Sequence, residues 1–453
     1  MIAQKYKEFI NHLIEQVKQE YLMNLNHPNV KYIDLIESFS KSFFDIQRRA
    51  IASYLEKMDL EFRNSPGRTL HYHVKKNEYR NLATRFGSIR FKRTVYISTY
   101  TGKCYIHVDR ELGLVKYDLY DPDVKGMILE SAAEHGEAKA GRIITSIINK
   151  CFKGVNISRQ LVRTIVNTSK LSEPKVNNKL VTDTLYVMAD ELFVSTQRDD
   201  KDLFVKHVVV FDGYKRKGKR LMLTNKHGIT TVGRGLSTKV LNYIVDSYDI
   251  EKISKVYVMG DGAGWIKSLR EHLIFNRSTT IYALDKFHFK QALRHITVDD
   301  DLREIVKSYI LNDRINDFNF VVDYLIELYP HREEVLSIKR NYMLNNLAAI
   351  KNMYNYRLSC CMESQISHNL AEIYTSRPKG FSRKHFAKRL RLRMLFKNKH
   401  NIKELYLNNL HTKKIIDMNQ VRLNHSLFDH SVKETVSFTN NKHASIKLKY
   451  LTH

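Results

Sequence analysis

Two aspartates follow apolar stretches of the sequence, where they could bind a divalent cation. Asp190 lies near the end of residues 184–193 (TLYVMADELF), and Asp261 comes just after residues 255–259 (KVYVM). A buried carboxylate is costly unless it is paired or bound to a cation. Ligands collect at the carboxyl ends of strands in open α/β sheets, so the two acids would meet there and bridge Mg²⁺ or Mn²⁺. The alternative is that each aspartate only caps the turn that follows it.

Such a site would carry out phosphoryl transfer. Two ions about 3.5–4 Å apart activate the attacking oxygen and stabilise the leaving one. Carboxylates and phosphate oxygens supply their ligands. The sequence therefore predicts a site for Mg²⁺ or Mn²⁺, with two ions, that acts on phosphate esters and is completed by a third acid.

The elements that would position the acids alternate between strand and helix. Their apolar patterns predict strands over 184–193, 204–211, 219–224, 255–259 and 279–284, and helices over 236–248, 265–275 and 287–295. Residues 212–218, rich in Gly and Lys, would form the hairpin loop between the second and third strands. A meander of three strands followed by alternating helix and strand predicts an α/β domain with a mixed sheet.

The rest of the chain divides by composition into further regions. Its 453 residues are enough for two or three domains. We predict an N-terminal helical region (1–64), a small β-rich region (65–120), a helix-turn-helix-like DNA-binding region (121–175), the first part of the α/β core (180–298), a helical insertion (299–355), the last part of the core with a basic segment (356–400) and a C-terminal region (401–453).

The charge of the chain points to a polyanionic partner. Lys and Arg number 75 against 48 Asp and Glu, a formal net charge of +27. A surplus of this size favours binding to nucleic acid. The sequence has no run of about 18 apolar residues that could cross a membrane, and its first residues lack the apolar core of a signal peptide. The four Cys show no CxxC spacing for zinc or a disulfide framework. We therefore expect a cytoplasmic DNA-binding protein without a membrane partner.

Residues 121–175 carry a pattern typical of a helix-turn-helix. Three short helices are predicted, over 123–134, 137–150 and 158–169. Ser158 can cap the third helix. That helix would be the recognition helix, with Arg159, Gln160 and Arg163 near its N-terminal end. A generic helical bundle gives the same pattern and remains the alternative.

A second basic segment follows the core. Residues 377–403 contain many Lys and Arg and no acid, which favours a helix facing phosphates over an ordinary solvated face. The candidate phosphate contacts are Arg383, Lys384, Lys388, Arg389, Arg391 and Arg393.

Several stretches resemble a known family. They are MADELFVSTQ (188–197), YVMGDGAGWI (257–266), YALDKFHFKQAL (282–293) and LSCCMESQISHNLAEIYTSRPKGFS (358–382). In order and spacing they are similar to bacterial insertion-sequence transposases of the ISLre-two group, which looks related to the Mutator superfamily. The resemblance runs from about residue 85 to about residue 395.

The resemblance implies an RNase H-like catalytic core with a helical insertion before its last acid. It also implies that Asp190, Asp261 and Glu363 are the catalytic, metal-binding acids. Asp285 and His288 are similar to the Cys/Asp-x-x-His motif of Mutator-type enzymes and would lie toward the DNA. On sequence alone, an Asp and a His one turn apart are more often an ordinary helical pair.

The third acid has competitors. Glu333 and Glu334 begin a predicted helix, where the helix dipole already accounts for acids. Glu363 lies in a weakly charged segment, and on a helix it would share a face with Ser359 and Ser367. We therefore prefer Glu363, with a surface glutamate paired to a nearby Lys or Arg as the alternative.

These expectations combine into a metal-dependent DNA transposase. It would nick DNA at the ends of an insertion sequence and transfer the freed 3′-OH into target DNA. Its partners would be terminal inverted repeats and target DNA, and it would act as a homo-oligomer on DNA, associated with the nucleoid. Two alternatives stay open: a standalone RNase H-like nuclease or resolvase, and a DNA-binding regulator that kept the fold and lost the chemistry.

Overall fold

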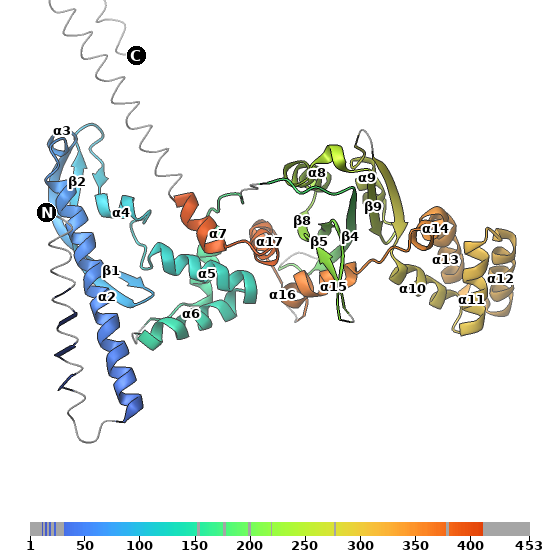
Figure 1. Cartoon of the computed structure of the whole chain (residues 1–453), viewed down its shortest axis with the longest axis horizontal. Helices are drawn as coiled ribbons and strands as arrows, with labels where there is room; N and C mark the ends of the chain where they lie inside the picture. The colour runs from blue at the N-terminus through green and yellow to red at the C-terminus, as the bar shows by residue number, and fades with distance from the viewer. Residues whose placement is uncertain are drawn as a thin grey trace, which may run out of the picture. The chain divides into compact units, whose positions relative to one another are not determined.

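The computed structural model describes most of the chain. The described residues are 31–151, 155–174, 178–197, 201–218, 220–275, 278–376 and 380–410, with a few positions between 11 and 23. The chain forms two compact units (Figure 1). The first comprises Met1–Glu173 and Asn401–His453, and the second comprises Pro174–His400. Within the described part, no helix is both long and apolar enough to cross a membrane.

A long helix packed on an antiparallel sheet begins the first unit. The elements are α2 (Tyr32–Arg63), α3 (Arg68–His71), β1 (Tyr72–Thr84), β2 (Gly87–Ser98), β3 (Cys104–Tyr105) and α4 (His107–Glu111). Leu55 of α2 packs against Leu82, Ile89 and Phe91 of the sheet. Helix α2 lies within the predicted helical region. Most of residues 1–30, the first half of that predicted region, lie outside the described residues.

Three packed helices complete the first unit, at the predicted places. They are α5 (Pro122–His135), α6 (Glu137–Cys151) and α7 (Arg159–Thr168). Ser158 caps α7 by accepting a hydrogen bond from the backbone N–H of Leu161. A Cβ at Gly141 of α6 would lie 2.4 Å from the carbonyl oxygen of Ile157, so glycine permits the close approach of the segment before α7.

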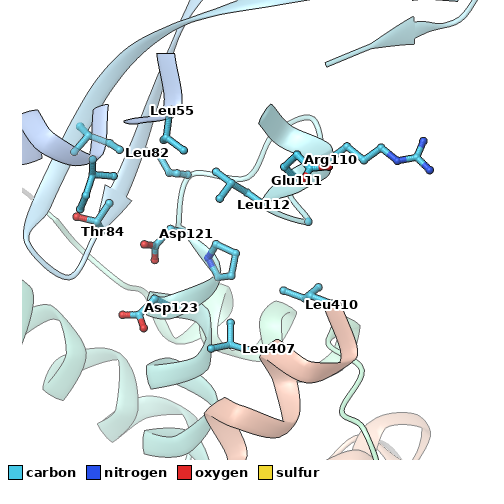
Figure 2. Close-up of a pocket in the computed structure, with 14 residues that line it drawn as sticks. Leu55, Leu82, Thr84, Arg110, Glu111, Leu112, Asp121, Asp123, Leu407 and Leu410 are labelled. Atoms are coloured by element: carbon cyan, nitrogen blue, oxygen red, sulfur yellow. The ribbon is translucent and has the colours of Figure 1, made fainter. Parts of the chain in front are cut away.

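The end of the described chain returns to this unit. Residues 402–410 are helical, and the hydroxyl of Ser172 donates to the carbonyl of Leu405. Beside this helix lies a cavity of about 300 Å³ with a mostly apolar lining (Figure 2). Asp121 and Asp123 lie at its edge, and burial raises the pKa of Asp121 to about 6. All of the residues that line the cavity belong to the first unit.

The second unit is built on a five-stranded mixed sheet of order β10-β9-β4-β5-β8. Its strands are β4 (Thr184–Val194), β5 (Leu203–Phe211), β8 (His227–Val232), β9 (Lys255–Gly260) and β10 (Thr279–Leu284). β4, β5 and β8 pair antiparallel, whereas β9 and β10 are parallel to β4. The α/β class and the mixed sheet are therefore confirmed.

One predicted strand was assigned to the wrong place. The third strand of the meander is β8, not residues 219–224. The latter overlap β7 (Arg220–Thr224), which pairs with β6 (Gly213–Lys217) in a separate hairpin where a loop was predicted. The sequence of β8, HGITTV, has a glycine and two threonines instead of an apolar run. A search for apolar alternation therefore passes over it.

Helices surround this sheet on its faces and edges. α8 (Leu236–Ser247) packs on β8 and β5, α9 (Gly264–Glu271) on β9 and β10, and α17 (Arg383–Lys397) on β8. The region predicted as a helical insertion is helical; it follows α10 (Lys286–Ile296) and comprises α11 (Asp300–Leu311), α12 (Ile315–Leu328), α13 (Glu333–Asn345) and α14 (Leu347–Asn355). The chain then crosses the sheet as α15 (Met362–Ile366), the π-helical turn η3 (Ser367–Ala371) and α16 (Glu372–Tyr374).

Candidate metal centre

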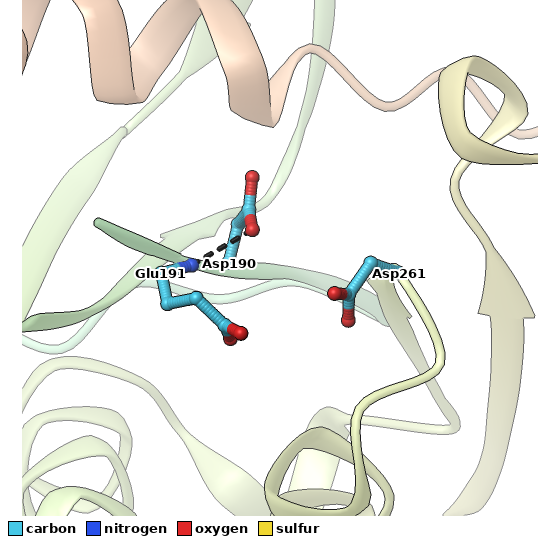
Figure 3. Close-up of side chains that lie close together, drawn as sticks. All are labelled: Asp190, Glu191 and Asp261. Atoms are coloured by element: carbon cyan, nitrogen blue, oxygen red, sulfur yellow. Dashed lines mark hydrogen bonds between the residues drawn. The ribbon is translucent and has the colours of Figure 1, made fainter. Parts of the chain in front are cut away.

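Parallel pairing of β4 and β9 brings the two predicted aspartates together. Met188 pairs with Met259, and each aspartate lies two residues further along the chain. One carboxylate oxygen each from Asp190, Glu191 and Asp261 lies within 4.8 Å of the others. Figure 3 shows the three side chains, with Asp190 and Glu191 leaving the strand on opposite sides. Carboxylate oxygens at this spacing form a donor set that suits a hard divalent cation.

Two glycines make room for Asp261. A Cβ at Gly260 would lie 2.6 Å from Cδ1 of Ile266 and 3.0 Å from the carbonyl oxygen of Ala189 on β4. Gly262 has a φ of +100°, in the left-handed region that side chains rarely adopt. The turn is closed by the backbone N–H of Ala263, which donates to the Asp261 carboxylate at 2.9 Å. Asp261 thus caps a turn, as the alternative expected, and also faces the other two acids.

The first two acids are held partly out of water. Burial raises the pKa of Asp190 to about 6, although its carboxylate accepts the N–H of Glu191 at 2.8 Å. Burial also raises the pKa of Glu191, whose carboxylate accepts the indole N–H of Trp265 at 2.7 Å. The nearby charge of Asp261 raises both pKa values further. A cation at this place would relieve the repulsion among the acids.

Glu191 was not among the residues predicted from the sequence. On a strand it points away from Asp190, so alternation assigns it to the other face of the sheet. The structure shows that a carboxylate from either face can reach Asp261 because both acids lie close to where β9 ends. The signal that could have found it is the Asp-Glu pair itself, two adjacent acids late in an apolar strand.

Asp285 and His288 lie in different surroundings. Asp285 is 3% exposed and caps α10, where its carboxylate accepts the N–H of Phe287. The prediction that it lies toward DNA is therefore wrong, because its side chain is enclosed within the protein. His288 is half-buried, and it lies close enough to Asp190 and Glu191 to lower their pKa values when charged.

Glu363 lies in the first turn of α15 and is exposed. It is not part of the carboxylate group formed by Asp190, Glu191 and Asp261. The helix begins only at Met362, so the expectation that Ser359 shares its face is wrong. The Tyr214 hydroxyl instead donates a hydrogen bond to the backbone carbonyl of Ser359. The dipole argument against Glu333 and Glu334 applies equally to Glu363, because all three lie in the first turn of a helix.

The basic helix α17 has exposed and buried cations. Arg389 is 6% exposed and Arg393 is 2% exposed, so neither presents its charge on the surface. Arg393 donates to the carbonyls of Asn369 and His368 and pairs with Glu372. The prediction that these two arginines contact phosphates is corrected by their burial. The side chains that remain exposed are Arg383, Lys384, Lys388 and Arg391.

The predicted recognition residues lie at the start of α7. Arg159 and Gln160 are exposed, and Arg163 is half-buried. The buried side chains of the helix, Val162, Ile165 and Val166, are on its other face. The polar face of α7 is therefore accessible in the first unit.

Comparison with known proteins identifies relatives along most of the chain. A UPF0236 protein of Caldanaerobacter subterraneus subsp. tengcongensis is 26% identical over 434 residues, which cover 93% of this chain and 90% of the relative. Another from that organism is 27% identical over 406 residues, covering 87% and 83%, and its name joins eleven loci.

A third relative, from Streptococcus gallolyticus, is named for its place in a vanSb 3′ region. It is 23% identical over 342 residues, which cover 71% of this chain and 72% of the relative. Residues 27–409 of this chain match the family model described as the uncharacterised protein family UPF0236. The chain therefore belongs to the uncharacterised protein family UPF0236.

Proposed function

We propose that the protein is a DNA transposase whose phosphoryl-transfer site is built on Asp190, Asp261 and a further acid. The observation that carries the proposal is the grouping of three partly buried carboxylates where β9 ends beside its parallel neighbour β4. The raised pKa values of Asp190 and Glu191 reflect burial and repulsion that a cation would offset. Partly buried acids with perturbed pKa values are typical of functional sites.

The sheet supports an RNase H-like core. The strands β4, β5 and β8 follow one another along the chain and pair antiparallel. The next two strands, β9 and β10, are parallel to β4 and lie on its other side, which gives the order β10-β9-β4-β5-β8. Asp190 lies on the first of these strands and Asp261 follows the fourth, which is the arrangement that the resemblance implies. Helices α11–α14 then separate the second acid from α15, as a helical insertion would.

The copy number of a relative supports a mobile element. One UPF0236 protein of Caldanaerobacter subterraneus subsp. tengcongensis carries a name that joins eleven loci, and another carries a name that joins four. Transposition of a gene would produce a protein that is named for many loci of one organism. This chain, as a member of the same family, is proposed to move its own gene in the same way.

Position along α15 supports Glu363 as the third acid. The N–H of Cys361 contacts the sulfur of Met188 at 3.4 Å, and Asn369 contacts His207, the cross-strand partner of Asp190, at 3.1 Å. The segment between them therefore crosses the face of the sheet that carries Asp190. Glu363 lies within that segment.

The side of α15 on which Glu363 lies also favours this role. Lys226, just before β8, donates to Gln365 at 2.9 Å, so Gln365 faces the β8 side of the sheet. Two residues correspond to about 200° around a helix. On this geometry Glu363 would lie on the opposite flank of the helix, the side of β9 and Asp261.

Each group of residues then has a distinct task in the proposed reaction. Mg²⁺ or Mn²⁺, when bound, would polarise the phosphate and activate the attacking oxygen. Asp190 and Asp261 hold the cation, and Trp265 orients Glu191 beside them. The exposed cations of α17 and the polar face of α7 bind the phosphate backbone and the terminal repeats, in an assembly of two or more copies.

A nicking and strand-transfer assay distinguishes this proposal from its alternatives. The probe is a linear duplex with the inverted repeats that flank the gene, incubated with target plasmid and Mg²⁺. A transposase joins the probe to the plasmid. A standalone nuclease or resolvase cuts without joining. A regulator binds the repeats and leaves the DNA intact, and either of these last two outcomes would contradict the proposal.

A further inference from the structure

A row of aromatic rings and one lysine lies next to the carboxylate group. Phe193 and Phe204 are cross-strand partners on β4 and β5, with ring centroids 5.3 Å apart. The Lys206 ammonium lies 5.7 Å from the Phe204 ring and 5.2 Å from the Trp265 ring. Trp265 in turn donates to Glu191, so the row ends at the acids. We call Phe193, Phe204, Lys206 and Trp265 the aromatic platform.

These side chains share one face of the sheet. Glu191 pairs with Lys206 and Phe193 pairs with Phe204, and residues two apart on a strand point the same way. Phe193 is 57% exposed although it lies on a central strand. Burial of a phenylalanine side chain is favourable, so packing within the protein does not explain why this ring is exposed beside the acids. Contact with a ligand would explain it.

We propose that the aromatic platform binds an unpaired nucleobase of the DNA beside the phosphate held at the acids. Aromatic rings interleaved with a cation are the pattern by which proteins bind single-stranded DNA: bases stack on the rings and the cation contacts the backbone. In a duplex both faces of a base are already stacked, so only an unpaired or flipped-out base can offer its face to Phe193. The inference rests on the proposed function, because the phosphate neighbouring that base is the one at the carboxylate group.

The position of Lys206 suits a phosphate between the bound base and the acids. Its ammonium lies between the Phe204 ring and the Trp265 ring, so it can contact one phosphate between a base on the phenylalanines and the acid group. An apolar protein partner would not require a charge at this place. A single unpaired nucleotide adjoining the scissile phosphate therefore fits the platform better than a peptide does.

The tryptophan of the platform provides a direct probe. Trp265 is the only Trp in the 453 residues, so intrinsic tryptophan fluorescence reports on this site alone. The full chain is titrated in EDTA, where no cleavage occurs, with a short oligothymidylate and with a blunt duplex of equal length. We expect saturable quenching by the single strand at concentrations at least several-fold below those needed for the duplex.

Variants separate stacking from general attraction. Phe193→Leu removes the exposed ring and should weaken binding of the single strand roughly five- to a hundredfold, the loss for one base stack. Phe193→Tyr keeps a ring and should bind as the wild type does. Phe320→Leu is the matched control, because Phe320 of α12 is 73% exposed and lies outside the platform. Lys206→Gln should reduce the salt dependence of binding by about one ion.

The outcomes also separate this inference from the proposed function. Equal quenching by duplex and single strand, wild-type affinity in Phe193→Leu, or an equal loss in Phe320→Leu would overturn the platform. If the protein nicks DNA but neither the single strand nor the duplex quenches its tryptophan fluorescence, the platform is overturned and the proposed function stays intact. Platform-dependent quenching by a protein that never cuts DNA would support the platform and contradict the transposase.

Discussion

Replacement of Gly260 by alanine tests how the chain brings the two aspartates together. The added methyl would lie 2.6 and 2.9 Å from two carbons of Ile266 and 3.0 Å from the carbonyl oxygen of Ala189. Ile266 is fully buried and Ala189 is in the neighbouring strand, so neither can yield cheaply. Overpacking of this kind costs about 1–3 kcal/mol. Part of the strain would be relieved by moving β9 away from β4, which separates Asp261 from Asp190.

Gly264→Ala is the matched control, four residues later. A Cβ there meets nothing within 4 Å, and the residue begins α9, where alanine is tolerated or slightly stabilising. Urea unfolding is followed by the fluorescence of Trp265, which reports on the second unit. Gly260→Ala should lower the unfolding free energy of this unit by about 1–3 kcal/mol and weaken Mn²⁺ binding, whereas Gly264→Ala should do neither. Equal stabilities of the two variants would refute this reading of the strand approach.

Three further predictions concern charged side chains. Burial raises the pKa of Asp190 from 3.8 to about 6, so in the metal-free protein its ionisation destabilises the fold increasingly as the pH rises between those values. Asp190→Asn should therefore stabilise the metal-free protein by about 1–2 kcal/mol above pH 6, after allowance for solvent screening. Thermal unfolding should show that this gain is lost near pH 4. Arg393→Gln should cost about 2–4 kcal/mol in urea unfolding, because the buried guanidinium binds two carbonyls and Glu372, while the exposed Lys384→Gln should change stability by less than about 0.5 kcal/mol. Lys384→Gln should instead weaken duplex binding and flatten its salt dependence by about one ion in a filter-binding assay.

The sequence predicted those parts of the site that apolar strands define. Asp190 and Asp261 were recognisable because a carboxylate late in an apolar strand has few alternatives to pairing or cation binding. Glu191 was missed because strand alternation places it on the opposite face. Its contribution depends on where β9 ends, which only the register between strands reveals.

The basic segment shows a different limit of sequence reasoning. Helix α17 has apolar side chains all around its axis, so no face is marked as the one that packs. The Arg393 side chain is buried against the π-helical turn and Glu372 of α16, and Tyr374 of α16 donates to the backbone carbonyl of Arg389. These contacts are set by tertiary packing, so the sequence of α17 does not show them. Composition alone therefore predicted a basic surface without distinguishing surface cations from those that stabilise the core.

The central claim is that Asp190 and Asp261 hold the cation with which this protein cuts DNA. Its most direct test is the rate of nicking of a duplex carrying the terminal repeats, measured against Mg²⁺ concentration for the wild type and for Asp261→Asn. We predict saturable, Mg²⁺-dependent nicking by the wild type, none in EDTA, and loss of nicking in Asp261→Asn with DNA binding and unfolding free energy nearly unchanged. Wild-type nicking in EDTA, or normal nicking by the folded Asp261→Asn variant, would contradict the claim.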